Sequence, residues 1–263
     1  MSAAPVGIYD SGVGGLSVFR EIRAALPLES VYYVADSANA PWGDKPHDFV
    51  RDRGLKIARF LVDQGVKAIV IGSNTGSAGS AEAVRAALTL PVVGMEPGIK
   101  PATAATRTRV VGAIVTNTMN GSDRWASLLG RFGGDVKVIS QPVPGLVEHV
   151  EAGDLDSPAL RRMVEGYVRP LIDAGADTIV LGSTHYIFLK PLIADVAGAN
   201  VTLIDTGEAV ARQLARVLGE RGLLAEAGAR AVERFWTSGD PAYSQRVISR
   251  LLGRPVEVEA LPE

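Results

Sequence analysis

The sequence predicts an α/β fold with two similar doubly wound parallel-sheet domains, and three observations lead to this prediction. Short runs of Val, Ile and Leu alternate with helical patterns along most of the 263 residues, as they do in βαβ units. The segment 67–73 (KAIVIGS) returns as 177–183 (DTIVLGS), which indicates two related halves. In both copies a Gly-Ser pair follows an apolar run typical of a strand that is buried on both faces.

The amino-terminal part alternates strands and helices in this way. The predicted strands are 6–10, 31–35, 68–71 and 91–95, and the predicted helices are 16–25, 49–64 and 77–88. The first helix stops before Pro27, because proline interrupts helical hydrogen bonding. The glycines at 12–15 do not have the spacing of a dinucleotide-binding loop, so the sequence does not favour nucleotide binding there.

The remaining chain repeats the alternation after a break at Glu96-Pro97-Gly98. The predicted strands are 110–115, 136–139, 178–182 and 201–204, and the predicted helices are 122–132, 157–174, 209–218 and 239–252, with a short helix around His149. The segments 231–236 and 256–258 are predicted to be late edge strands. We therefore expect a first domain of residues 1–97 plus 210–263 and a second domain of residues 98–209.

Composition narrows the classes of partner. A net charge of −2 offers no basic face, so no nucleic-acid partner is expected. No run approaches the roughly 18 apolar residues of a membrane span, and the start lacks the basic region of a signal peptide, so we expect a cytoplasmic protein that binds no membrane. There is no cysteine, which removes disulfides and thiol nucleophiles. The three histidines are too scattered for a metal site, so none is predicted.

Polar side chains follow several predicted strands, at the sheet edge where open α/β sheets bind ligands. They include Asp10, Ser11, Ser73, Ser183 and His185. Each also has an ordinary interpretation. Serine and aspartate often cap the next helix, and a histidine can belong to a satisfied core. Likewise Trp42, in the polar loop 36–44, is predicted either to line a small pocket or simply to pack.

Motifs spread along the chain make it resemble the aspartate/glutamate racemase superfamily, and the glutamate racemases within it most closely. They are GIYDSGVGGL at 7–16, Asp36-Ser37 with PWG at 41–43, Asn74-Thr75, LG at 181–182 with THY at 184–186, and IDTG at 204–207. The resemblance implies two domains related by pseudo-twofold symmetry, with the amino acid in the cleft between them. That agrees with the repeated segment.

The resemblance also implies a cofactor-independent reaction, the interconversion of L- and D-glutamate for peptidoglycan synthesis. In this family one cysteine removes the α-proton and another delivers a proton on the opposite face, and these positions fall on Ser73 and Ser183. A serine hydroxyl is a far weaker acid than a thiol and acts only when another group takes its proton, so we expect strongly impaired activity. Val143 lies where many relatives carry a further cysteine. Both an engineered variant and a natural, diverged member fit these residues.

The remaining roles are likewise carried over from the resemblance. Asp10, His185 and Glu151 correspond to the groups that assist the two catalytic positions, although Glu151 also fits a solvated helix-face carboxylate. The expected substrate-binding residues are Asp10, Ser11, Pro41, Trp42, Gly43, Asn74, Thr75, Thr116, Thr118, Thr184 and His185, with Thr116 an alternative to Thr118. These neutral donors suit glutamate as a small-molecule partner. A monomer and a homodimer both remain open.

Three other functions stay open at this point. A non-catalytic protein that binds an amino acid would keep the pocket without the chemistry. A related one-base lyase, such as a decarboxylase, would need protonation on one face only. A hydrolase with a serine, a histidine and an acid is the least favoured, because neither Ser73 nor Ser183 lies in a G-x-S-x-G turn.

Overall fold

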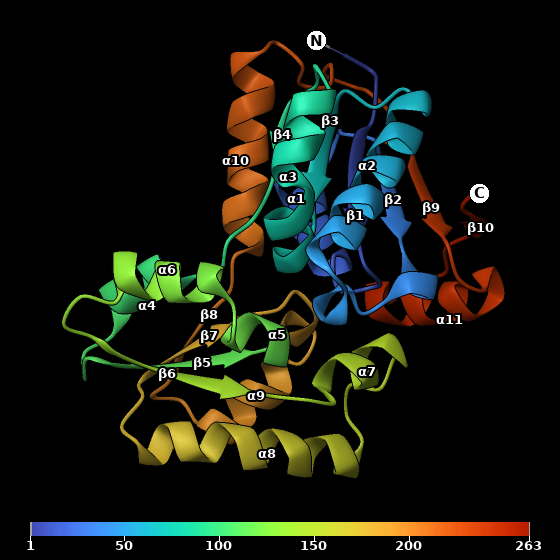
Figure 1. Ribbon diagram of the computed structural model, residues 1–263. Coiled ribbons are helices and arrows are strands. Elements are labelled where there is room, and N and C mark those ends of the chain that lie inside the picture. The colour runs from blue at the N-terminus through green and yellow to red at the C-terminus, as the bar shows by residue number, and fades with distance from the viewer. Residues whose placement is uncertain (1, 263) are drawn as a thin grey trace. The chain divides into compact units, whose positions relative to one another are not determined.

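The computed structural model describes residues 2–262, and their contacts divide the chain into two compact units. The first domain runs up to Met95 and resumes at Gly207, and the second domain is Glu96–Thr206. Each is an α/β unit with a parallel sheet, as the sequence predicts (Figure 1). No helix within residues 2–262 has the length and apolar character to cross a membrane.

The sheet of the first domain has the strand order β10-β9-β2-β1-β3-β4, with every neighbouring pair parallel. Its strands are β1 (Val6–Asp10), β2 (Val31–Ala35), β3 (Ala68–Ile71), β4 (Val92–Val93), β9 (Glu233–Thr237) and β10 (Val258–Ala260). Its helices are α1 (Leu16–Ala25), α2 (His47–Asp63), α3 (Asn74–Ala87), α10 (Gly207–Glu220) and α11 (Pro241–Leu252). The loop after β2 holds two short 3₁₀ helices, Ser37–Asn39 and Trp42–Asp44.

Helices cover both faces of this sheet, which is why its central strands β1, β2 and β3 are largely apolar. Tyr9 packs in a buried cluster with Ile57 of α2 and Val84 of α3. On the other side, Tyr33 of β2 forms an aromatic cluster with Phe19 of α1. Side chains alternate between the faces of a strand, so a strand buried on both sides cannot show polar positions at every second residue.

The sheet of the second domain has the order β6-β5-β7-β8, again entirely parallel. Its strands are β5 (Val110–Val115), β6 (Lys137–Pro142), β7 (Thr178–Leu181) and β8 (Thr202–Ile204). Its helices are α4 (Ile99–Ala105), α5 (Asn117–Asn120), α6 (Asp123–Phe132), α7 (Leu146–Glu151), α8 (Pro158–Asp173) and α9 (Lys190–Ala197). Ile99 and Trp125 cover one face, while Leu171 of α8 lies against Gly112 on β5.

The repeated segment occupies equivalent places in the two sheets. The order β2-β1-β3-β4 of the first matches β6-β5-β7-β8 of the second, so β3 and β7 correspond. After β3, Gly72 N–H donates to the Tyr9 carbonyl at 2.8 Å, and after β7, Gly182 N–H donates to the Ile114 carbonyl at 2.9 Å. A Cβ on Gly182 would lie 2.6 Å from that carbonyl oxygen, so glycine is required there. The two copies of the repeated segment are therefore alike in structure as well as in sequence.

The first residue of each repeated segment anchors loops at the amino ends of its sheet. Lys67 Nζ lies 2.5 Å from Glu29 Oε2 in a buried ion pair, and it also donates to the Ser2 carbonyl at 2.9 Å. Its counterpart Asp177 accepts hydrogen bonds from Thr106 Oγ1 at 2.6 Å and from the Arg107 backbone N–H at 2.7 Å. Lys67 and Asp177 thus hold loops at the amino ends of the two sheets with side chains of opposite charge.

The structure corrects two sequence predictions. Segment 231–236 is not an edge strand, because β9 lies between β10 and β2. Phe235 packs on Phe19 and Trp236 packs on Phe60, which buries both faces of β9. Helix α3 begins at Asn74 and not at residue 77, because Ser73 caps it.

Candidate functional site

Ser73 follows β3 at the carboxyl edge of the first sheet, where it is the N-cap of α3. Its Oγ accepts the backbone N–H of Gly76 at 3.1 Å, which satisfies one of the free donors of the first helical turn. The ordinary capping interpretation of this serine is therefore correct for its hydrogen bond. Ser73 is only 6% exposed. The hydroxyl is held in one place by the helix it caps.

Asp10 ends the neighbouring strand β1 and organises the turn that follows. Its Oδ1 accepts from the Ser11 backbone N–H at 2.6 Å and from Ser11 Oγ at 3.2 Å, and its Oδ2 accepts from the Gly15 N–H at 2.6 Å. A Cβ on Gly15 would lie 2.8 Å from Asp10 Cβ and 3.1 Å from the Gly72 carbonyl oxygen. Gly15 thus lets the carboxylate of Asp10 and the Gly72-Ser73 turn approach the same point.

Trp42 is fully buried, and its side chain packs in the hydrophobic core with Tyr9 and Val50. Its Nε1 donates to Asp36 Oδ2 at 3.0 Å, and that carboxylate also pairs with Arg53 of α2. A Cβ on Gly76 would lie 3.2 Å from the indole ring, so Trp42 supports the first turn of α3. Pro41 is exposed and Gly43 half-buried beside it.

Asn74 and Thr75 form the first turn of α3, directly after Ser73. Asn74 is buried and Thr75 is half-buried. The helix is tied to β1 because Tyr9 Oη and Ser80 Oγ lie 2.9 Å apart, and Ser80 Oγ also donates to the Gly76 carbonyl at 2.7 Å. No motif in the sequence reveals this pair, since a tyrosine on a strand and a serine on a helix are common everywhere.

Ser183 follows β7 at the equivalent edge of the second sheet, but its surroundings differ from those of Ser73. Its Oγ lies 3.3 Å from His185 Nδ1, and His185 Nε2 lies 2.6 Å from Glu151 Oε1 at the end of α7. His185 is 5% exposed, Ser183 is half-buried and the Glu151 side chain is 23% exposed. The structure therefore brings together three residues that are separated by up to 34 positions in the chain.

The carboxylate fixes the tautomer of this histidine. An ionised carboxylate can only accept a hydrogen bond, so Nε2 carries a proton toward Glu151. In the neutral ring Nδ1 then holds a lone pair that faces the Ser183 hydroxyl. Glu151 is thus engaged by the histidine rather than solvated on a helix face, and His185 has both ring nitrogens in polar contacts.

The threonines expected to bind substrate differ in exposure. Thr184 is 3% exposed beside Ser183. Thr116 follows β5 and its Oγ1 accepts the Met119 N–H at 3.2 Å, so it caps α5. Thr118 is exposed within α5. Val143 is 1% exposed after β6, where its N–H donates to the Val115 carbonyl at 3.1 Å.

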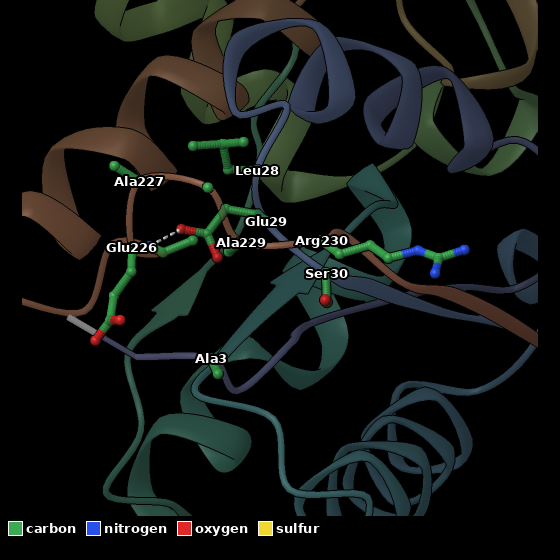
Figure 2. Close-up of a pocket in the computed structure, with 10 residues that line it drawn as sticks. Ala3, Leu28, Glu29, Ser30, Glu226, Ala227, Ala229 and Arg230 are labelled. Carbon is green, nitrogen blue, oxygen red and sulfur yellow. Dashed lines mark hydrogen bonds between the residues drawn. The ribbon is translucent and has the colours of Figure 1, made fainter.

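A cavity of about 360 Å³ lies elsewhere in the first domain, among residues that precede β1, β2 and β9 (Figure 2). It is therefore at the amino edge of the sheet, opposite to the edge that carries Ser73. Glu29 lies in its lining, where Oε1 accepts the Ala225 N–H at 2.7 Å. None of the sequence-predicted site residues lines it. Across residues 2–262 no group of three or more His, Asp or Glu side chains could hold a metal ion.

Comparison with known proteins gives consistent results. The family model for Asp/Glu/hydantoin racemases matches residues 15–214. A glutamate racemase of Pseudomonas entomophila is 51% identical over 261 residues, which are 99% of this chain and 98% of that protein. The crystal structure of a Bacillus anthracis glutamate racemase isoform superposes with a TM-score of 0.88 at 31% identity, covering 100% of this chain and 98% of that one.

A third relative was solved with ligands. The Escherichia coli glutamate racemase, in complex with L-glutamate and an activator, superposes with a TM-score of 0.84 at 29% identity. The match covers 98% of this chain and 97% of that one. These likenesses extend over both domains.

Proposed function

Because the chain belongs to the Asp/Glu/hydantoin racemase family, we propose that it is an amino-acid racemase whose substrate is glutamate, interconverted between the L and D forms without a cofactor. The identity of 51% with a glutamate racemase, over nearly the whole length of both proteins, is the main support for this substrate. The equivalent places of Ser73 and Ser183 after β3 and β7 support a reaction that uses one group from each domain.

In the proposed reaction, the groups at positions 73 and 183 act on opposite faces of the α-carbon. One removes the α-proton while the other delivers a proton, so the configuration inverts. Which group is the base depends on the enantiomer bound. The proposed inversion uses both groups, because a single base fixed on one face would return the proton to the face from which it came.

The two positions receive different help. Asp10, which ends the strand next to β3, would take or supply a proton on the Ser73 side. On the Ser183 side the contact of His185 with Ser183 Oγ at 3.3 Å provides the base, and Glu151 stabilises the imidazolium that forms. Both hydroxyls also accept a backbone N–H, Ser73 Oγ from Gly76 at 3.1 Å and Ser183 Oγ from His185 at 3.4 Å, so the difference between the two sides is the imidazole that contacts Ser183. We therefore propose that the proton leaves more easily from Ser183 than from Ser73.

Serine at both positions makes this form a slow enzyme. A thiol with a pKa near 8.5 yields thiolate at neutral pH in a favourable environment, whereas a hydroxyl loses its proton only to a neighbouring base. The serines preserve the geometry of capping and hydrogen bonding. We accordingly propose that substrate binding is retained while proton transfer is strongly reduced.

The proposed substrate-binding groups are neutral. Asn74 and Thr75 in the first turn of α3 would hold one carboxylate, since helix N-termini present free N–H donors. Thr184, Ser11, and Thr116 or Thr118 would complete the set. Pro41 and Gly43 would contribute backbone, whereas buried Trp42 acts by supporting α3.

We place this reaction in the cytoplasm, as a supply of D-glutamate for peptidoglycan synthesis. The homodimer stays a prediction that sedimentation velocity tests.

Titration calorimetry with the protein as it stands tests the substrate. We expect both L- and D-glutamate to bind, and Asn74→Leu to weaken binding of both. Thr103→Val, a change at a half-buried position on α4, serves as the control and leaves binding unchanged. If neither enantiomer binds, glutamate is not the substrate.

A second candidate is a protein that binds glutamate without turning it over. The two serines favour it, since neither is a thiol. It differs from the first in one outcome: tight binding of glutamate with no exchange of the α-proton, even when cysteine is introduced at both positions.

A further inference from the structure

We propose that Ser183 is a nucleophile activated by His185 and Glu151, and that the protein hydrolyses small aryl esters through an acyl-serine intermediate. This activity goes beyond racemisation. It uses only groups of the second domain, so it does not depend on the function proposed for Ser73.

The three side chains are arranged as an activated serine requires. A serine becomes nucleophilic when a base lies within hydrogen-bond reach and a third group orients that base. Ser183 Oγ lies 3.3 Å from His185 Nδ1, and His185 Nε2 lies 2.6 Å from Glu151 Oε1. The first distance is somewhat long, as such contacts often are before substrate binds. The order is therefore hydroxyl, imidazole, carboxylate.

Burial strengthens this arrangement. His185 is 5% exposed, and a charge on a buried imidazole is stabilised by a carboxylate more strongly than it would be in water. Glu151 fixes the proton on Nε2, so Nδ1 is the atom that receives the proton of Ser183. Ser183 itself is only half-buried, so the residue is not closed off from solvent.

The reaction proceeds in two balanced steps. Ser183 Oγ attacks the carbonyl carbon of p-nitrophenyl acetate, its proton passes to His185 Nδ1, and the bond to p-nitrophenolate breaks to leave acetyl-Ser183. The imidazolium then releases that proton to solvent, so Nδ1 is a base again. Water attacks the acetyl carbon and gives a proton to Nδ1, which passes it to Ser183 Oγ as the acyl bond breaks, and the acetic acid that leaves ionises to acetate in solvent. Aryl esters are the expected class because a phenolate leaves without needing a proton first.

A second cluster in the same domain contains the same residue types in another order. His149 Nδ1 lies 2.7 Å from Asp154 Oδ2, and Ser157 Oγ donates to that same oxygen at 2.6 Å. Here the carboxylate lies between the serine and the imidazole, so the histidine cannot take the serine's proton. His149 and Ser157 thus serve as controls, because a serine, a histidine and a carboxylate in this order should not contribute to ester hydrolysis.

The test measures release of p-nitrophenolate and, by peptide mass spectrometry, the position of the acetyl group. We expect acetylation of Ser183 and a rate that falls at least about tenfold in Ser183→Ala, His185→Gln and Glu151→Gln. The double change Ser183→Ala with His185→Gln should be no slower than either alone, because the groups act as a unit. His149→Gln and Ser157→Ala should keep the full rate.

Circular dichroism and thermal unfolding establish that each variant is folded. Should Ser183→Ala not fold, labelling of the unchanged protein with a phosphonyl fluoride replaces it: Ser183 Oγ bonds to phosphorus, fluoride leaves, and His185 takes the proton. Label on Ser183 that is lost in His185→Gln supports the proposal. An unchanged rate in folded Ser183→Ala, or label on another residue only, overturns it.

Discussion

His185 Nε2 lies 2.6 Å from Glu151 Oε1, whereas Asp10, which ends the strand beside β3 in the first domain, directs its carboxylate to the backbone of Ser11 and Gly15. The two halves of the molecule share a strand order but differ in the groups around their equivalent serines. The His185–Glu151 pair joins the end of α7 to the segment after β7. We therefore expect substitutions around Ser183 and around Ser73 to have different effects.

The His185–Glu151 pair should be required for proton transfer at position 183. In a protein carrying Ser73→Cys and Ser183→Cys, we expect Glu151→Gln to lower the racemisation rate at least about tenfold, because the imidazole loses the carboxylate that stabilises its charged form. Polarimetry with glutamate measures the rate. His149→Gln, on the same helix, is the control, and an equal loss in that variant would mean that α7 and not the pair is responsible.

Ser73 should contribute to stability as a helix cap. We expect Ser73→Ala to lower the free energy of unfolding by about 1 kcal/mol, because the Gly76 N–H loses its acceptor. Urea denaturation measures the change. Ser183→Ala is the matched comparison and should cost less, since the backbone N–H that Ser183 Oγ accepts, from His185, lies farther away at 3.4 Å. Equal losses in the two variants would contradict the distinct roles of the two serines.

Asp10 should stabilise the turn before α1. Replacing it by asparagine keeps its size but gives the side chain only one acceptor oxygen for the N–H groups of Ser11 and Gly15. We expect a loss of about 1–3 kcal/mol, the cost of one buried donor left unsatisfied. Urea denaturation of Asp10→Asn provides the measurement, and a loss below the experimental error would show that the turn holds without the carboxylate.

Asp177 should make stability depend on pH in the acid range. Its burial opposes ionisation, but hydrogen bonds from Thr106, Arg107, Thr108 and Thr178 outweigh that effect and lower its pKa well below its ordinary value of 3.8. Because the folded-state pKa is the lower one, the stabilisation is complete above about pH 4 and is lost as the pH falls toward the folded-state pKa.

Asp177→Asn tests this dependence. The variant should lose about 2 kcal/mol at pH 7, and its difference from the unchanged protein should narrow below about pH 4. Thermal unfolding across the pH range measures it. Asp135→Asn removes an exposed carboxylate paired with Arg109 and should change stability little. A difference that stays constant down to pH 2 would contradict the assigned pKa.

The strands could be predicted from sequence because they are short apolar runs bounded by glycine or polar residues. Strands β1, β2 and β5 match their predicted bounds, and the echo of β3 in β7 holds in the sheet order. Strand β9 was misplaced at an edge, because its neighbours come from distant parts of the sequence. The start of α3 was predicted too late, since nothing in the segment GSNT shows whether its serine precedes or follows the first turn.

The site was less predictable than the fold. Sequence spacing placed Ser183 and His185 near each other, but the contact with Glu151 depends on how α7 packs beside the segment after β7. The burial of Trp42 could not be predicted from the sequence either. Its loop is polar, yet the indole is fully buried and reaches Asp36 and the first turn of α3, a contact that only the folded chain creates.

Exchange of the α-proton of glutamate in deuterated water, followed by proton NMR, tests the central claim most directly. That claim is that positions 73 and 183 hold the two acid–base groups of one racemisation reaction. We predict that Ser73→Cys combined with Ser183→Cys exchanges the α-proton of both enantiomers far faster than the unchanged protein does. A folded double variant that binds glutamate and exchanges neither enantiomer would contradict the claim.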